Sequence, residues 1–514
     1  MFKLFSDTFN INEIIDSSSN EVLLENEFTV ADSLPDIEKI ISTEGKVKIT
    51  GTSAGSGKVD VYGNVVYNII YRSNDEETVV CSVSGSIPFS EEIPVAGASD
   101  HMDVQPRAYI DYMDAEPLTE RTYQVKSVVM LDTDVISSHP VDFVSNLESD
   151  GSFQAKTRNI RYTDTSRMLS EEASISDGVE IGKNSDEIAS ILKSESSVYV
   201  TNVDEMDDKM LVEGICKVGF LYAENNSLST PGYVSEEFPF THYLEAKNSG
   251  GSALKDIDII PGEMTFNTAE NYDNEKRLIE FNLPFTINAT LYDTVEKNII
   301  TDCYSTESLL QLTSDKVKLN SLKDIKNKTV KFESNLDVLS GTVKDIYTVD
   351  FSPKISEKRL YEDRYVVDGF LDVNVLYLNS DINKIDKAYG SMPFTASIDL
   401  EGEAAPNVDS AIKLSKCSAY RKGSNSVIVS CDINVSMKFR DEDEIEVISN
   451  IEEVGPVDHS KMPSLIFRVV QPGETVWDIA KNYNLSINYL KELNELPPDN
   501  VLVPGSKIII ARKV

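Results

Sequence analysis

One segment occurs three times in the sequence, and this repetition constrains the fold more than any other feature. A glycine is followed eight residues later by a tyrosine at Gly63–Tyr71, Gly214–Tyr222 and Gly369–Tyr377. An apolar-Pro-Phe-Ser/Thr signature follows 25, 25 and 24 residues after those glycines. The periods, 151 (63 to 214) and 155 (214 to 369), match the size of a domain and exceed a solenoid unit. We therefore expect three homologous domains in tandem.

The start of each repeat is marked less regularly. Ile37 and Ile188 each precede the repeat glycine by 26 residues. In the third copy the best counterpart is Ile346, only 23 residues before Gly369, which indicates that this copy has drifted.

The residues of each repeat predict β-structure. Apolar residues alternate along Val61–Tyr71 and Val367–Tyr377, as is typical of a strand with one buried face. The chain is expected to be mainly β, with three sandwich or open-barrel domains at 1–150, 151–315 and 316–455, arranged like beads on a string. Helical spacing over 185–193 predicts that each unit opens with a short helix.

Charge and cysteine content narrow the possible partners. The chain has 514 residues, with 86 acidic and 48 basic side chains and a net charge of −38. Such a field repels phosphate and anionic lipid, so we expect no nucleic-acid partner. An apolar run near 20 residues is absent, so no membrane insertion is expected. Five scattered cysteines without a C-x-x-C pair, and an N-terminus unlike a signal peptide, favour a reducing compartment.

Sequence motifs give no sign of catalysis. The four histidines are scattered without metal-ligand spacing. The segment Gly51–Lys58 resembles a phosphate-binding loop, but its glycine spacing is wrong and Val59 replaces the Ser/Thr. It is expected to be a hairpin turn. We expect no catalytic residue, no metal site and no cofactor, and hence no enzyme.

The last 51 residues differ in kind from the repeats. After an expected linker at 455–463, residues 464–514 hold six basic and five acidic side chains, so this segment is about +1 and the remainder about −39. Thr475 and Asp478 form a capping-box pattern before a helix whose apolar stripe is Val476, Ile479, Ala480 and Tyr483. A second helix and a strand at 507–511 follow, which predicts a βααβ domain.

This segment resembles the LysM module. The resemblance rests on Val469-x-x-x-Gly473-Glu474-Thr475-Val476-Trp477, then Asn494, then Leu502-x-Pro504-Gly505; Glu474 replaces the usual turn Asp. LysM modules usually bind N-acetylglucosamine polymers, and the resemblance assigns the groove to Gly473, Glu474, Thr475, Leu502, Pro504 and Gly505. The single tryptophan, Trp477, lies off the buried stripe, which favours a protein partner. We expect Trp477 to anchor that partner, with Leu465 and Ile466 in the same patch; packing of Trp477 on a neighbouring strand is the alternative.

The tandem β-domains resemble the SPOCS-type domains of clostridial spore-coat proteins. With a C-terminal LysM module, the resemblance implies a scaffold in the mother-cell cytoplasm, at the forespore surface. It implies that the LysM module binds a SpoIVA-like coat-basement ATPase and that other coat proteins are recruited. The competing hypothesis is a cell-wall protein that binds peptidoglycan, with a cryptic hydrolase among its β-domains.

Overall fold

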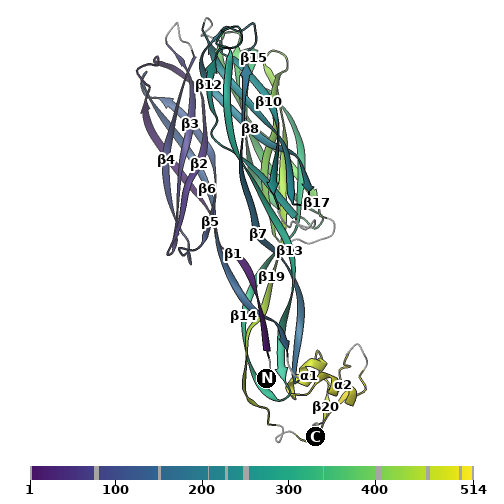
Figure 1. Cartoon of the computed structure of the whole chain (residues 1–514). Helices are drawn as coiled ribbons and strands as arrows, with labels where there is room; N and C mark the ends of the chain where they lie inside the picture. The colour runs from purple at the N-terminus through teal and green to yellow at the C-terminus, as the bar shows by residue number, and fades with distance from the viewer. Residues whose placement is uncertain are drawn as a thin grey trace.

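The chain forms an elongated, mainly β molecule with a broad head, a narrow stalk and a small domain at the stalk end (Figure 1). The computed structural model describes residues 3–74, 80–148, 152–206, 208–225, 230–246, 254–339, 341–400, 407–458, 463–496 and 501–511. The predicted mainly β fold with a C-terminal βααβ domain is confirmed.

Each repeat is built from the same six strands, and the second repeat has one more. The first repeat comprises β1 (Lys3–Thr29), β2 (Ile37–Gly55), β3 (Lys58–Ser73), β4 (Val80–Pro94), β5 (Asp103–Pro117) and β6 (Thr122–Glu148). The second comprises β7 (Phe153–Glu180), β8 (Ile188–Met206), β9 (Lys209–Glu224), β10 (Gly232–Glu245), β11 (Leu254–Pro261), β12 (Thr265–Ala269) and β13 (Leu278–Ser305). The third comprises β14 (Ser308–Asp337), β15 (Val343–Leu360), β16 (Arg364–Asn379), β17 (Lys384–Asp399), β18 (Asn407–Arg421) and β19 (Ser426–Pro456). The expected domain ranges were 1–150, 151–315 and 316–455.

Two antiparallel sheets form a sandwich in each repeat. In the first repeat their strand orders are β2-β3-β4 and β1-β6-β5, and the other repeats follow the same plan. The predicted alternation of Val61–Tyr71 is confirmed, because its odd-numbered residues are buried between the sheets. Each Pro-Phe signature lies on an edge strand, β4, β10 or β17, where proline removes no hydrogen bond from a second neighbour. The segment Gly51–Lys58 forms the expected hairpin turn between β2 and β3.

Two expectations about the repeat starts are wrong. The third counterpart of Ile37 and Ile188 is Val343, which is fully buried, begins β15 and precedes Gly369 by the same 26 residues. The segment expected to form a helix at 185–193 instead enters strand β8. Register shifts after Ile188 and Ile191 turn the strand, so apolar residues at helical spacing are buried by a bulged strand.

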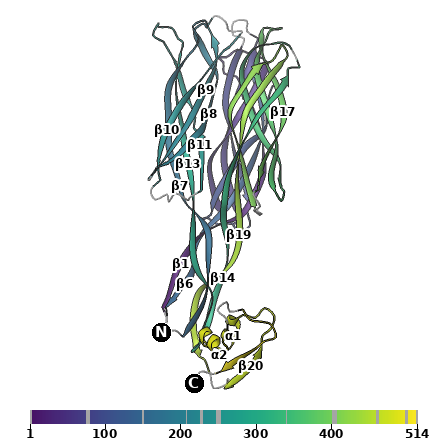
Figure 2. The same cartoon turned by 90° about the vertical axis from the view of Figure 1, so that its right-hand side faces the viewer.

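The three sandwiches pack side by side, so the expected beads-on-a-string arrangement is wrong (Figure 2). Equivalent apolar residues of β2, β8 and β15 meet at the centre of the head, namely Ile41, Leu192 and Tyr347. A second equivalent set comes from β3, β9 and β16: Ile70, Leu221 and Leu376. The head is therefore one pseudo-threefold assembly with a shared core.

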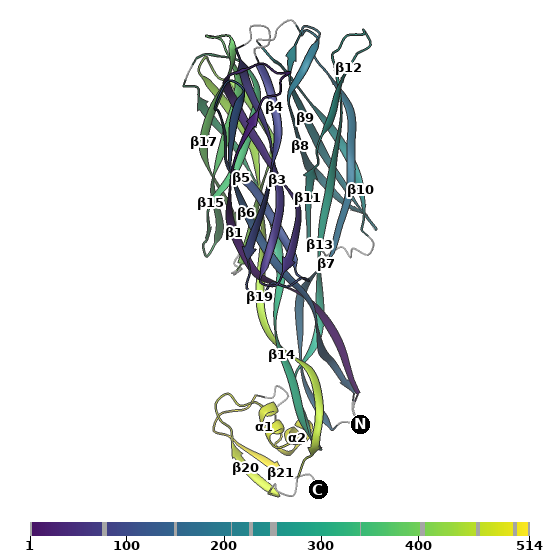
Figure 3. The same ribbon diagram turned by 90° about the vertical axis from the view of Figure 1, so that its left-hand side faces the viewer.

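Long strand pairs extend from the sandwiches and join to form the stalk (Figure 3). The pairs are β1–β6, β7–β13 and β14–β19, with strands of 27 to 31 residues. Each pair contributes to one buried cluster: Phe9, Ile11, Phe143, Ile160, Tyr162, Ile299, Val317, Leu319, Ile445 and Val447. The rings of Phe9 and Phe143 stack at 4.1 Å between centroids. The stalk core thus belongs to all three repeats.

The segment after β19 leads to the C-terminal domain. Residues 459–462 of the expected linker lie outside the described residues. Within the described part of the chain, no helix is long and apolar enough to cross a membrane.

Candidate functional site

The C-terminal domain is a two-stranded antiparallel sheet covered on one face by two short helices. Its elements are β20 (Leu465–Val469), α1 (Val476–Asn482), α2 (Ile487–Leu493) and β21 (Lys507–Ala511). Its core is the apolar set Val470, Val476, Ile479, Ala480, Leu485, Leu490, Ile508 and Ile510. Asn494 ties the end of α2 to β21, because its side chain accepts from Ile509 N at 2.6 Å and donates to Ile509 O at 2.8 Å.

The predicted capping box at the start of α1 is present. The Thr475 hydroxyl accepts from Asp478 N at 3.2 Å, and the Asp478 carboxylate accepts from Thr475 N at 2.9 Å. The Thr475 hydroxyl also donates to Asp478 Oδ2 at 2.7 Å. This hydrogen bond first, and then the one from Thr475 N, hold the pKa of Asp478 below its usual value. The box fixes the direction in which α1 leaves the preceding turn.

The groove-equivalent residues lie on two adjacent loops. Gly505 N donates to Val470 O at 2.9 Å, which holds the loop after α2 beside the loop after β20. The exposed members of the set are Gly473, Thr475, Pro504 and Gly505, whereas Glu474 and Leu502 are half-buried. Residues 497–500 of the second loop lie outside the described residues.

The Glu474 carboxylate binds to groups of its own turn and of the preceding strand β20. Its carboxylate accepts from Gln471 N at 2.9 Å and pairs with the Arg468 guanidinium. The backbone hydrogen bond and then the arginine hold the pKa of Glu474 below its usual value, so the group is anionic at neutral pH. These partners stabilise the turn and occupy the oxygens that a sugar hydroxyl would contact.

Trp477 does not lie on a free surface, because it contacts the end of the stalk. Its indole Nε1 donates to Asp302 Oδ2 at 2.7 Å, and its ring meets Tyr304 edge-on at 5.1 Å between centroids. Lys481, one turn further along α1, pairs with the other oxygen of Asp302 at 2.6 Å. The side chain is half-buried by this contact. Binding of a partner by Trp477 stays a prediction, and it would require this contact to open.

Further contacts fix the C-terminal domain on β13. The buried hydroxyl of Tyr304 donates to Leu485 O at 2.7 Å, and the Asn484 side chain donates to Ser305 O at 2.9 Å. Asp302, Tyr304 and Ser305 were not expected to be site residues. They lie about 180 residues from α1, and no local pattern marks them.

The outer face of the C-terminal sheet is apolar and exposed. Leu465, Phe467 and Val469 alternate along β20 with exposed fractions of 51%, 63% and 45%. Ile509 and Ala511 of β21 lie opposite Phe467 and Leu465 in the ladder. Ile466 points to the other face and packs against the domain core. We call Leu465, Phe467 and Val469 the outer patch. Leu465 and Ile466 were expected in one patch with Trp477, and their binding of a partner stays a prediction.

Phe467 and Val469 could have been found from the sequence. Period-two alternation along β20 places them on the face of Leu465. This alternation is hard to recognise, because apolar residues occur on both faces of this short strand.

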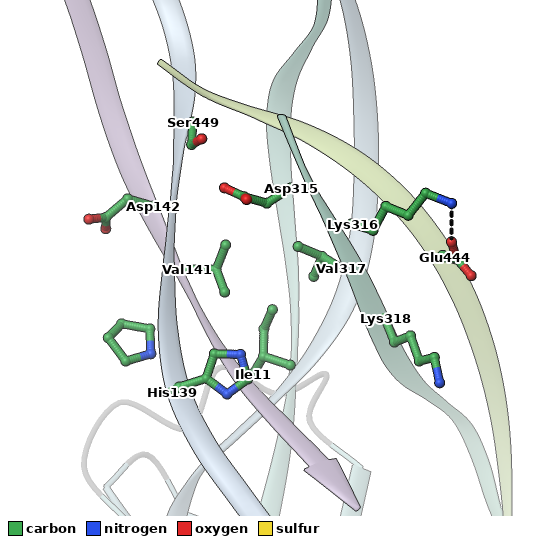
Figure 4. Close-up of a pocket in the computed structure, with 11 residues that line it drawn as sticks. Ile11, His139, Val141, Asp142, Asp315, Lys316, Val317, Lys318, Glu444 and Ser449 are labelled. Atoms are coloured by element: carbon green, nitrogen blue, oxygen red, sulfur yellow. Dashed lines mark ion pairs between the residues drawn. The ribbon is translucent and has the colours of Figure 1, made fainter. Parts of the chain in front are cut away.

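A cavity of about 550 Å³ opens in the stalk between β1–β6 and β14–β19 (Figure 4). Its ionisable lining residues include His139 and Asp142 on β6 and Asp315 on β14. Lys316 pairs with Glu444 across β14 and β19 at 3.2 Å. No nucleophile in this lining is paired with a general base, and the described residues contain no group of three or more His, Cys, Asp or Glu arranged for a metal.

The segments that match protein-family models agree with the domains seen in the structure. The family model described as SipL, SPOCS domain matches residues 36–118, 187–261 and 342–420. These ranges cover β2–β5, β8–β11 and β15–β18, which lie between the long stalk strands of each repeat; β12 of the second repeat lies outside them. A LysM domain model matches residues 469–511. No curated protein and no solved structure matches the chain.

Proposed function

We propose that this protein, which carries three SipL SPOCS domains and a LysM domain, is a non-enzymatic scaffold of the spore envelope. The SPOCS domain is sporulation-associated, and SPOCS and LysM are families of non-catalytic modules. The scaffold would act in the mother-cell cytoplasm at the forespore surface. Its LysM domain would bind a SpoIVA-like coat-basement ATPase, and other coat proteins would be recruited through the complex.

The observation that carries this proposal is the outer patch. Three large apolar side chains lie exposed on one face of the C-terminal sheet. This sheet lies at the end of the stalk (Figure 3). Contiguous exposed apolar surface costs free energy in water and is typical of protein interaction sites. The LysM segment is about +1 while the remainder is about −39, so an acidic partner would be repelled less at the LysM end than elsewhere.

The alternative function, binding of peptidoglycan, is favoured by one observation. The loops that correspond to the glycan groove remain exposed at Gly473, Thr475, Pro504 and Gly505. Against it, the Glu474 carboxylate is already engaged by Arg468 and Gln471. The two functions use different faces of the domain, which makes them separable by mutation.

The test compares two exposed apolar residues in the full chain. Phe467→Glu places a carboxylate in the outer patch, while Leu23→Glu makes the same change at a residue of β1 that is 72% exposed. We expect Phe467→Glu to weaken binding to the purified coat-basement ATPase at least about tenfold, because a hot-spot side chain is worth about 2 kcal/mol. Leu23→Glu should leave the affinity unchanged.

Binding to insoluble peptidoglycan is measured with the same three proteins. Pelleting of the unsubstituted chain with peptidoglycan, together with ATPase binding that is equal in both variants, would support the alternative. Absence of any ATPase binding by the unsubstituted chain would overturn the proposal.

A further inference from the structure

Three carboxylates from the three repeats converge at the centre of the head. Glu44, Glu195 and Asp350 each lie seven residues after the first residue of β2, β8 and β15. All three lie within ion-pair distance of one ammonium group, that of Lys193. They are therefore equivalent residues that the pseudo-threefold arrangement brings to one point.

Among the described residues, Lys193 is the one cation that pairs with these three carboxylates. Its Nζ lies 2.7 Å from Glu44 Oε2, 2.7 Å from Asp350 Oδ2 and 3.6 Å from Glu195 Oε2. Its side chain is only 5% exposed. The equivalent residues in the other repeats are Ser42 and Thr348, which are buried but uncharged. One ammonium thus faces three carboxylates, and the cluster carries excess negative charge when all are ionised.

Neutral donors satisfy part of the cluster. The Ser42 hydroxyl donates to Glu44 Oε1 at 3.2 Å, and the Tyr233 hydroxyl of β10 donates to Glu195. The buried hydroxyl of Thr348 has no hydrogen-bond partner among the described residues. Near Asp350 lies Cys417 of β18, whose carbonyl accepts from the Lys217 ammonium of β9 at 3.1 Å. These residues and the four ionic groups are the polar surroundings of Glu44.

We propose that this cluster is a proton-sensitive lock that holds the three SPOCS domains together and loosens as the pH rises through neutrality. At this level of the head the domains meet through the shared apolar core, through the cluster and through a hydrogen bond from Asn68 Nδ2 to Leu192 O at 3.4 Å. Two carboxylates from different repeats, Glu44 and Asp350, both contact the same ammonium, so they repel each other unless one holds a proton. Protonation of Glu44 removes that repulsion.

The direction follows from the titration of Glu44. Burial, and then the nearby Asp350 carboxylate, raise the pKa of Glu44 to about 7. A carboxyl with a raised pKa in the closed head stabilises it fully below the ordinary value of 4.5, and this stabilisation is lost as the pH rises through 7. Burial works to lower the pKa of Lys193, but the carboxylates outweigh it and keep the group charged throughout this range.

Amide hydrogen exchange of the full chain tests the proposal. After correction for intrinsic exchange, protection of Ile41, Leu192 and Tyr347 reports how often the head opens. If the pKa of Glu44 returns to 4.5 on opening, the open-to-closed ratio should rise about tenfold between pH 6 and pH 8. Glu44→Gln, which mimics the protonated form, should make this ratio nearly independent of pH. Glu21→Gln, at an exposed position of β1, should keep the tenfold response.

Each result decides the proposal. An unsubstituted head whose corrected exchange is the same at pH 6 and pH 8 overturns it, as does a tenfold response that survives in Glu44→Gln. If Glu44→Gln does not fold, Asp350→Asn serves instead, because it removes the same repulsion, and loss of the pH response in that variant supports the lock. Lys193→Met should open the head at both pH values, whereas Lys46→Met, at an exposed position of β2, should not.

Discussion

The ring of Phe89 on β4 covers Gly63 on β3 so closely that a Cβ atom on Gly63 would lie 2.4 Å from Phe89 Cζ. The same contact occurs between Gly214 and Phe240 at 2.4 Å. It occurs again between Gly369 and Phe394 at 2.5 Å. The glycine and the Pro-Phe signature of each repeat are therefore one structural unit, in which an aromatic ring covers the backbone of a central strand.

Alanine at these glycines is expected to destabilise the sandwich. The added methyl group must displace a packed aromatic ring, which costs about 1–3 kcal/mol. The cost should be larger for Gly369→Ala than for Gly63→Ala, because the new atom would also lie 2.3 Å from Lys354 O, against 3.0 Å from Lys48 O. Denaturant unfolding of the full chain measures the difference.

Gly51→Ala is the matched control, since a Cβ atom there would meet nothing within 4 Å. It should change the free energy of unfolding by less than about 0.5 kcal/mol. Equal effects of Gly51→Ala and Gly369→Ala would contradict the ring-over-glycine account.

Much of each domain could be predicted from the sequence, because its signals are local. Alternation along Val61–Tyr71 gave the buried face, and the repeated spacing gave the number of domains. The pairing of Gly63 with Phe89 could not be deduced, since alternation along β3 and β4 indicates the buried face of each strand but not the register between the two strands. The capping box at Thr475 was predicted because its residues are only three apart.

The contact between Trp477 and Asp302 allows docking of the C-terminal domain on the stalk to be measured by fluorescence. Trp477 is the only tryptophan in the chain, so its fluorescence reports on this contact alone. Asp302→Ala removes the acceptor of the indole N–H and the partner of Lys481, which should weaken docking by about 2 kcal/mol. The emission should shift to longer wavelength as the indole becomes exposed. Asp315→Ala removes an exposed carboxylate on another stalk strand, β14, and should leave the spectrum unchanged.

The same variant tests the predicted role of Trp477 in partner binding. If the indole anchors a partner, its release from Asp302 should raise the affinity of the full chain for the coat-basement ATPase. Trp477→Glu should then abolish that gain. An affinity that is the same in Asp302→Ala and in the unsubstituted chain would assign Trp477 to the stalk contact only.

Single repeats are not expected to be stable alone. Phe9 and Phe143 of the first repeat pack against Tyr162 of the second and Val317 of the third. A fragment of residues 1–150 would expose these rings, and Phe9→Ala in the full chain should cost about 3–5 kcal/mol. Phe9→Ala should therefore lower the unfolding midpoint of all three repeats together, as measured by calorimetry.

The stalk core shared by the three repeats also changes the expected pattern of limited proteolysis. Repeats that fold separately would be cut first near 145–160, 310–325 and 455–463. Residues 310–325 lie in β14 and are hydrogen-bonded to β19, so cleavage there should be slow. Mass spectrometry of the first fragments would falsify the shared-core account if stable pieces ended in that range. The shared core could not be predicted from the sequence, because the period of a repeat indicates the length of one domain and not how the domains pack together.

The last prediction concerns the cap of α1, where a matched control lies in the same domain. Thr475→Ala removes the hydroxyl that accepts from Asp478 N, which should cost about 1 kcal/mol. Ser486 occupies the same position before α2 but makes no capping hydrogen bond, so Ser486→Ala should cost much less. Thermal unfolding of the full chain, followed by Trp477 fluorescence, measures both at neutral pH.

The pH dependence separates the cap from a general loss of packing. The pKa of Asp478 is lowered in the folded domain, so its contribution to stability is present above the unfolded value of 3.8 and is lost as the pH falls below it. The Thr475 hydroxyl helps to lower this pKa, so the difference between Thr475→Ala and the unsubstituted chain should shrink from pH 6 to pH 2. A difference that stays constant over this range would show that Thr475 acts through packing and not through the cap.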